Sequence, residues 1–264
     1  MPTATFLKAH SLAEALTFLD DTTDSVPLAG GTDLMVMLHA RSVAPAALVD
    51  IWSLKELKGI RETGDAIVIG AAESYTAIIR SPLVQQHLPA LAEVAQTIGA
   101  AQIQNRGTLG GNLANASPAG DTLPFMLAAD AVIVTDRREI PVTDFFTSYR
   151  QTVLQQGELI VSVRFPRDGR NIRFRKVGTR QAQAISKVVI AVCREPSRIA
   201  IGSVAEVPLR AASAEAALER GDITGAVAAV ERDIRPQDDV RSSAEHRRRV
   251  TSNVLRQLLV NGAV

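Results

Sequence analysis

Two glycine pairs, placed far apart in the sequence, constrain the fold of this chain more than any other feature. The first lies in Leu28–Leu34 and the second in Thr108–Leu113, and in each an apolar lead-in precedes two glycines and a small polar residue. Glycine lets the main chain approach a ligand closely and adopt positive φ, so that successive N–H groups can converge on an anion. A helix that starts after such a turn adds its positive end. The two turns together predict two loops that hold one large phosphate-bearing cofactor between them.

Polar side chains beside the glycines fit the same interpretation. Thr32 and Thr108 offer hydroxyl donors and Asn112 offers an amide. Asp33 is expected to cap the helix that follows the first turn rather than to touch phosphate. Neither G-x-G-x-x-G nor G-x-x-x-x-G-K-[ST] occurs in the chain. A single glycine pair would indicate only a turn, so the repeated pattern is what favours a cofactor site.

A loop of small residues follows the second glycine pair. The stretch Asn115–Asp121 consists mostly of small side chains, which leave room for a flat ligand. The carboxylate of Asp121 can accept hydrogen bonds from sugar or ribityl hydroxyls. An alternative interpretation makes Asp121 the cap of the helix that carries Pro124, and the two roles are compatible.

Composition excludes several classes of function. Of the 264 residues 46% are apolar, and the formal net charge is +1, so no global electrostatic argument favours nucleic acid or a membrane surface. A single cysteine, Cys193, forms neither an internal disulfide nor a zinc-finger or iron–sulfur site, and the four histidines show no metal-ligand spacing. No apolar run has the length of a membrane span, and Met1–Phe6 lacks the features of a signal peptide, so we expect a cytoplasmic protein.

Hydrophobic periodicity predicts helices and strands arranged in three parts. The first part is expected to be a compact α/β unit, whose helix over 11–19 opens with a capping box of Ser11 and Glu14. Further helices are expected from 33 onward, over 76–79, 89–98, 122–128, 213–220 and 223–230, and from 242 or 243 onward. Strands are expected over 26–29, 48–51, 66–70, 131–134, 158–165, 173–177, 187–192 and 198–204.

Apolar side chains alternate along the strand expected over 158–165, and the composition of the chain changes directly after it. Proline, glycine and charged residues cluster over 166–171, which indicates a domain boundary. No serine or cysteine lies in a nucleophile motif, so a cofactor would have to carry any chemistry. The alternation predicts one face with Leu159, Val161, Val163 and Phe165 and another with Ile160, Ser162 and Arg164.

These residues resemble a known family. The stretch Leu28–Leu34, followed by Thr108–Asn112, Ser117–Pro118 and Asp121, is similar to the FAD-binding (medium) subunit of the molybdenum hydroxylases of the xanthine dehydrogenase and carbon monoxide dehydrogenase type. The resemblance covers essentially the whole chain. It implies an α+β fold, with a two-subdomain FAD-binding domain of the vanillyl-alcohol-oxidase type and a C-terminal domain of a small antiparallel sheet and helices. The expected bounds are 1–168, with subdomains of about 1–55 and 56–168, and 169–264.

The resemblance also implies which residues contact the cofactor. Ile98 matches an apolar contact near the flavin ring, Ile160 another cofactor-lining position, and Lys176 a lysine that reaches the cofactor. From the residues alone, the two isoleucines are equally compatible with core packing and Lys176 with a solvated strand charge. The other cofactor-binding residues implied are Leu28, Ala29, Gly30, Gly31, Thr32, Asp33, Leu34, Thr108, Gly110, Gly111, Asn112 and Asp121. No catalytic residue and no metal ligand is expected on this chain.

Cofactors and partners follow from the same resemblance. FAD would lie on this chain, two [2Fe–2S] clusters on a small partner subunit and molybdopterin on a large one, in a heterotrimer or its dimer. Electrons would pass from the clusters to FAD and on to NAD+ or another acceptor. Two alternatives remain open, a free-standing flavin oxidoreductase and a non-catalytic assembly subunit that has lost FAD. One departure from the family is Gln104, which replaces a usual arginine and leaves Arg106 as a candidate to supply the charge.

Overall fold

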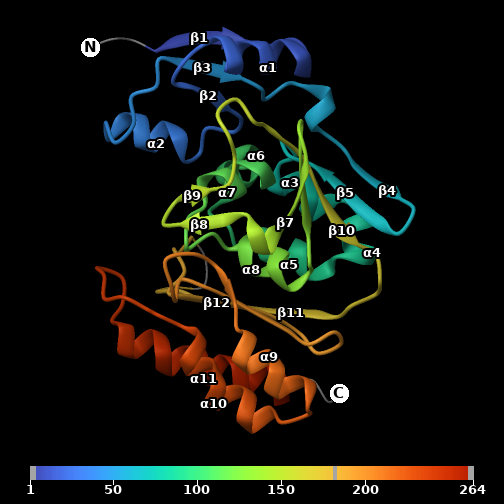
Figure 1. Cartoon of the computed structure of the whole chain (residues 1–264), viewed down its shortest axis with the longest axis vertical. Coiled ribbons are helices and arrows are strands. Elements are labelled where there is room, and N and C mark those ends of the chain that lie inside the picture. Colours follow the sequence, from blue (N-terminus) through green and yellow to red (C-terminus); the bar gives the residue numbers. More distant parts are fainter. Residues whose placement is uncertain (1–3, 181–182, 261–264) are drawn as a thin grey trace.

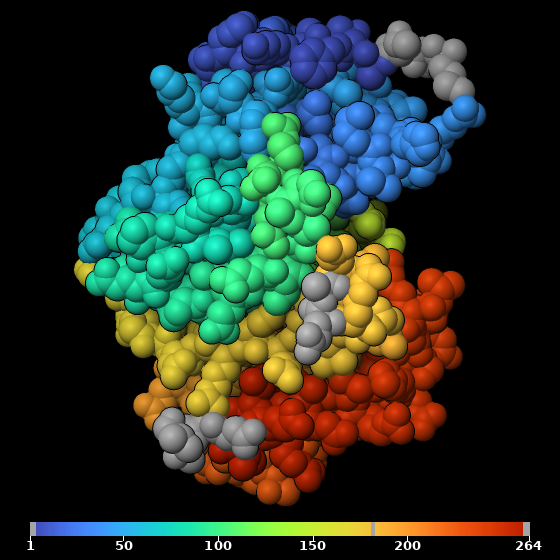
Figure 2. Space-filling model, turned by 180° about the vertical axis from the view of Figure 1, so that it is seen from behind, coloured from blue at the N-terminus to red at the C-terminus, as the bar shows by residue number. Residues whose placement is uncertain are grey.

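The computed structural model describes residues 4–180 and 183–260, which form three units stacked along the long axis of the molecule (Figure 1). The N-terminal unit lies at one end, a larger central unit follows, and the C-terminal unit lies at the other end. Seen from behind, a green segment of the central unit reaches up against the blue N-terminal unit (Figure 2). Within the described residues, no helix is long and apolar enough to cross a membrane.

The N-terminal unit is a small parallel sheet with two helices. Its strands pair in the order β1-β3-β2, and its helix α1 begins with Ser11 as the N-cap, as predicted, while Glu14 bonds to the residue before that cap. The Ser11 Oγ accepts from the Glu14 N–H at 3.1 Å, and the Glu14 carboxylate accepts from the N–H of His10 at 2.6 Å. The elements are β1 (Thr5–Lys8), α1 (Leu12–Asp21), β2 (Ser25–Leu28), α2 (Leu34–His39) and β3 (Ala47–Asp50).

The central unit is an antiparallel sheet packed against helices. Its strand order is β4-β5-β10-β6-β7, so the late strand β10 completes a sheet begun by much earlier residues. The strands are β4 (Ile60–Thr63), β5 (Ala66–Gly70), β6 (Val132–Thr135), β7 (Glu139–Pro141) and β10 (Ile160–Pro166). The helices are α3 (Tyr75–Arg80), α4 (Pro82–His87), α5 (Pro89–Gln96), α6 (Ala101–Arg106), α7 (Leu109–Asn115) and α8 (Thr122–Ala128). A separate hairpin joins β8 (Phe146–Ser148) to β9 (Gln151–Thr152), and short 3₁₀ helices lie at Lys55–Leu57 and Val142–Asp144.

The strict alternation of side chains predicted along 158–165 is wrong in the first half of this segment. The pairing register between β10 and β6 shifts between Ile160 and Ser162, which is the signature of a bulge. Ile160 therefore turns to the central core that also holds Val163 and Phe165, whereas Leu159 and Val161 pack against the core of the N-terminal unit. The bulge lets one strand serve two cores.

The C-terminal unit is an antiparallel sheet sandwiched between two layers of helices. Val188, Ile190 and Val192 of β12 face the helices of this unit, whereas Ala191 and Cys193 belong to the central core. Since both faces of the strand are buried, its sequence reads as a continuous apolar run. The elements are β11 (Ile172–Val177), β12 (Val188–Cys193), β13 (Arg198–Gly202), β14 (Leu209–Arg210), α9 (Ala212–Glu219), α10 (Ile223–Asp233) and α11 (Ala244–Val260).

Candidate functional site

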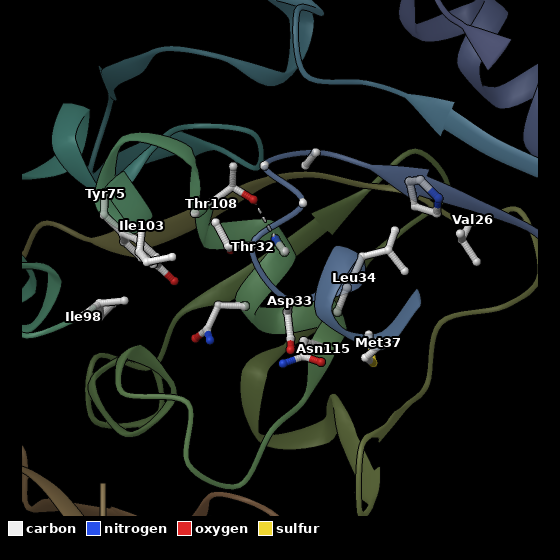
Figure 3. A pocket seen from close by; sticks show the side chains of 18 residues that line it. Val26, Thr32, Asp33, Leu34, Met37, Tyr75, Ile98, Ile103, Thr108 and Asn115 are labelled. Atoms are coloured by element: carbon white, nitrogen blue, oxygen red, sulfur yellow. Dashed lines mark hydrogen bonds between the residues drawn. The ribbon is translucent and has the colours of Figure 1, made fainter. Parts of the chain in front are cut away.

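A cleft of about 370 Å³ lies between the N-terminal unit and the helices α6 and α7 of the central unit. It has two ends of different character (Figure 3): Ile98, Ile103 and Tyr75 gather at one, and Asp33 lies beside Asn115 at the other. The predicted site residues that line it are Ala29, Gly30, Gly31, Thr32, Asp33, Leu34, Ile98, Thr108, Gly111 and Asn112. The structure therefore brings both glycines of the first pair and Gly111 of the second to one cleft, whereas Gly110 does not line it.

The first glycine turn touches the central unit through Gly30. A Cβ atom at this position would lie 1.6 Å from the carbonyl oxygen of Arg106, at the end of α6. Gly31 has φ +74°, in the left-handed region that favours glycine. Gly30 is thus required because α6 of the central unit lies too close for a side chain, and Gly31 because its own backbone has positive φ.

The same turn offers backbone N–H groups that are free to bind a ligand. The N–H of Met35, just beyond it, donates to the Gly31 carbonyl at 3.0 Å. A backbone N–H group without an acceptor raises the free energy of the folded chain, unless water or a ligand supplies the acceptor. This turn is therefore suited to bind an anion such as a diphosphate. Throughout residues 4–180 and 183–260, no group accepts a hydrogen bond from the N–H of Gly30, Gly31, Thr32, Asp33 or Leu34.

The second glycine pair lies in the first turn of α7, not in a loop as the sequence suggested. The Gly110 N–H donates to the Ala71 carbonyl at 2.8 Å, and the Gly111 N–H donates to Thr108 Oγ1 at 3.0 Å. A Cβ on Gly110 would lie 2.7 Å from the Ala71 Cβ. The N–H donors expected from this pair are therefore already used, and its glycines serve close packing.

Side chains replace those N–H groups on the α7 side of the cleft. Thr122 Oγ1 donates to Asn112 Oδ1 at 2.6 Å, and Thr122 itself is fully buried. This bond assigns the oxygen of the Asn112 amide to the protein, so its NH₂ group is left to donate into the cleft. The Thr108 hydroxyl accepts from Gly111 and keeps its own hydrogen for another acceptor.

Asp33 does not cap α2, although the sequence predicts that it does. Its side chain makes no cap hydrogen bond. One carboxylate oxygen lies instead 3.6 Å from Nη1 of Arg150, which also donates to Asn115 Oδ1 at 2.5 Å. Arg150 lies between β8 and β9, and no motif around it signals a place beside the cleft.

Gln104 has a structural role at the end of α5. Its amide nitrogen donates to the carbonyl oxygens of Gln96 and Ile98, both at 3.1 Å, and so closes the end of α5. This fixes the backbone of Ile98 at the apolar end of the cleft. Arg106 does not line the cleft, because its guanidinium stacks over Trp52 at 3.8 Å from the ring centroid.

Asp121 and Lys176 form a buried pair at the seam between the central and C-terminal units. Lys176 Nζ lies 2.6 Å from Asp121 Oδ2 and donates to the Thr97 carbonyl at 2.9 Å, while the Ser186 hydroxyl donates to Asp121. Burial raises the pKa of the Asp121 carboxyl, and the positive charge of Lys176 opposes that rise. Asp121 makes no cap bond to α8, so its side chain does not act as the helix cap that the sequence allowed. Only 10% of the Lys176 side chain is exposed, so Lys176 is not a solvated strand charge.

The buried pair lies close to the cleft but does not line it. Tyr75 connects the two places, because it lines the cleft while burial and the negative charge of Asp121 raise the pKa of its phenol. The tyrosine therefore stays protonated. No sequence motif pointed to Tyr75 or to Ile103, whose roles depend on the packing of α3 and α6.

Two further predicted residues lie elsewhere. Ile160 is 4% exposed and packs in the central core, as the core-packing alternative describes. Leu28 ends β2, and its side chain packs beneath Gly31 rather than in the cleft.

The fold places a cleft lined by the first glycine turn and by α7 between the N-terminal and central units, and comparison with known proteins identifies the class. Residues 2–168 match the family model described as the FAD binding domain in molybdopterin dehydrogenase, and residues 173–261 match the CO dehydrogenase flavoprotein C-terminal domain. The chain belongs to the FAD-binding medium subunits of the molybdenum hydroxylases and is an oxidoreductase subunit.

Individual relatives agree over nearly the whole chain. The glyceraldehyde dehydrogenase medium chain of Sulfolobus acidocaldarius is 32% identical over 94% of both chains. The carbon monoxide dehydrogenase medium chain of Hydrogenophaga pseudoflava is 31% identical over 94% of this chain and 93% of its own. A solved structure of that organism's carbon monoxide dehydrogenase superposes with a TM-score of 0.91, covering 97% of this chain and 96% of the other. Quinoline 2-oxidoreductase from Pseudomonas putida 86 superposes equally well, at 25% identity.

Proposed function

We propose that this chain relays electrons through FAD within a cytoplasmic complex of three kinds of subunit. A small subunit would deliver electrons from [2Fe–2S] clusters, a large subunit would hold molybdopterin and the organic substrate, and NAD+ or another acceptor would take the electrons away. When bound, FAD supplies the ability to take up electrons singly and to release them as a pair. The observation that carries this proposal is the row of N–H groups without an acceptor in the first glycine turn, which lines the same cleft as Asn112.

The two ends of the cleft suit the two parts of the cofactor. The N–H groups of 30–34, with the side chains of Asn112 and Thr108, would hold the diphosphate, because they are donors on residues that line the cleft. Ile98 and Ile103 would pack against the flavin ring at the apolar end. Asp121 and Lys176 are proposed to reach the cofactor from the seam with the C-terminal unit, which would place the ring near two units at once.

A spectrum tests this function directly. The full chain, purified alone and together with its partner subunits, is expected to absorb as a flavoprotein and to release one FAD on denaturation. In the complex, the bound FAD should be reduced when the molybdenum subunit is given its substrate. A colourless chain that releases no flavin would contradict the proposal and favour an assembly subunit. Turnover of an organic substrate by the isolated chain would favour a free-standing flavin enzyme.

A further inference from the structure

The cleft carries a negative side-chain charge, which does not suit the diphosphate proposed to bind there. Of the described residues that line it, Asp33 alone carries a carboxylate, and none carries a cationic side chain. Asp33 follows directly on the free N–H groups of Gly31 and Thr32, and 42% of its side chain is exposed. A carboxylate at this place would repel the two negative charges of a diphosphate. The site therefore needs a cation from outside its own lining.

Arg150 is the cation that reaches this place. It comes from the β8–β9 hairpin of the central unit, far along the chain from the first glycine turn. Its Nη1 lies 3.6 Å from Asp33 Oδ2 and is held by Asn115 Oδ1 at 2.5 Å. Asp33 and Asn115 lie together at the polar end of the cleft in Figure 3. One guanidinium thus bridges both walls at the end where the free N–H groups lie.

We propose that Arg150 is a positioning residue for the cofactor, which neutralises and holds the Asp33 carboxylate so that the cleft accepts a diphosphate. The inference rests on the proposed function, because it needs FAD in this cleft. It accounts for the missing cap bond of Asp33, which stands at the N-cap of α2 while its carboxylate lies beside the Arg150 guanidinium. Arg150 acts through Asp33 and is not itself required to touch the cofactor.

The competing interpretation is a mechanical one, in which Arg150 only ties the hairpin to α7 and α2. The two interpretations differ in what they predict for ligands. A tie would affect every flavin equally, whereas a charge effect depends on the phosphates of the ligand. An exposed ion pair contributes little to folding stability, so removing it should leave the thermal midpoint nearly unchanged.

The test measures flavin affinity by fluorescence titration of the full chain freed of cofactor. Arg150→Met is expected to weaken FAD binding about tenfold, because the unpaired carboxylate then faces the diphosphate. Binding of riboflavin, which has no phosphate, should change less than twofold. The double variant Asp33→Asn with Arg150→Met should regain FAD affinity to within about threefold of the wild type, because the repelling charge is gone as well.

Two controls separate charge from packing. Arg164→Met removes an arginine of similar exposure that pairs with Glu139 on the central sheet, and FAD affinity should not change. Arg150→Lys keeps the charge and should bind FAD nearly as well as the wild type.

Specific outcomes would overturn the inference. Equal losses for FAD and riboflavin in Arg150→Met, or a double variant as weak as the single one, would leave Arg150 as a mechanical tie. Unchanged FAD binding in Arg150→Met would remove it from the site altogether. A wild-type chain that binds no FAD would instead contradict the proposed function, so the two failures are distinguishable.

Discussion

At the scale of the residue, the glycines of the two turns serve different purposes. Gly30 is pressed against the backbone of α6, Gly31 adopts positive φ, and Gly110 packs on Ala71. Gly111 would meet only the Thr108 hydroxyl, whose displacement costs one cap hydrogen bond and no main-chain rearrangement. The two glycine pairs look alike in the sequence, but the contacts that require a glycine differ between them.

This difference predicts unequal effects of alanine. Gly30→Ala should weaken FAD binding at least tenfold and destabilise the chain by about 2 kcal/mol, because the Cβ meets a main-chain carbonyl and the turn must retreat. Gly111→Ala should cost far less in both measurements. Flavin titration and thermal unfolding of the two variants check this. Similar behaviour of the two variants would contradict the asymmetry of the turns.

At the scale of the element, capping decides what becomes a helix. Thr108 caps α7 with its hydroxyl, and Ala116 ends the helix in the left-handed conformation at φ +46°. The two glycines inside this helix each lower its propensity by about 1 kcal/mol, which is why the sequence suggested a loop. The cap and the packing of Gly110 on Ala71 offset that cost.

The start of β10 depends on a single carboxylate. Glu158 accepts from Arg138, from the N–H of Gln155 and from Thr135, and the bonds from Arg138 lower the pKa of this carboxyl to about 2. Because the folded pKa lies below the ordinary 4.5, the stabilisation is complete above about pH 4.5 and is lost as the pH falls towards 2.

The predicted variant is Glu158→Gln. Its thermal midpoint should lie below that of the wild type at pH 7, and the gap should narrow as the pH falls through this window. Melting curves at several pH values measure the gap. Glu139→Gln, which removes an exposed partner of Arg164, serves as a control with little expected change. A gap that does not vary with pH would show that the charge of Glu158 is unimportant.

At the scale of the whole molecule, the three units share their cores rather than merely touching. The C-terminal sheet contributes residues of β12 to the central core, and Val161 of β10, with Leu159 just before that strand, packs in the N-terminal core. Asp130 adds an ionic contact, because it pairs with Arg170, Arg198 and Arg210 from the C-terminal part of the chain. We therefore expect the cofactor site to respond to changes at the seam behind it.

The pair of Asp121 and Lys176 tests this coupling. Lys176→Met leaves a carboxylate buried without its cation, so we expect a loss of about 3–5 kcal/mol in the free energy of unfolding of the cofactor-free chain. The double variant Asp121→Asn with Lys176→Met should recover most of that loss. Chemical denaturation of the three proteins gives these values. A double variant less stable than Lys176→Met alone would rule out the buried charge as the cause.

The sequence by itself determined the order of most helices and strands, the nature of the first glycine turn and the family, because caps, periodicity and turn residues act over short distances along the chain. It did not reveal the bulge at Ile160, the helical state of Gly110 or the arrival of Arg150 beside Asp33. Those features arise from residues distant in sequence that meet only when the units pack and bury their faces together. The first glycine turn can be recognised as a candidate binding element from its residues. Which residues lie opposite it, on α6, α7 and the β8–β9 hairpin, was decided by the tertiary structure.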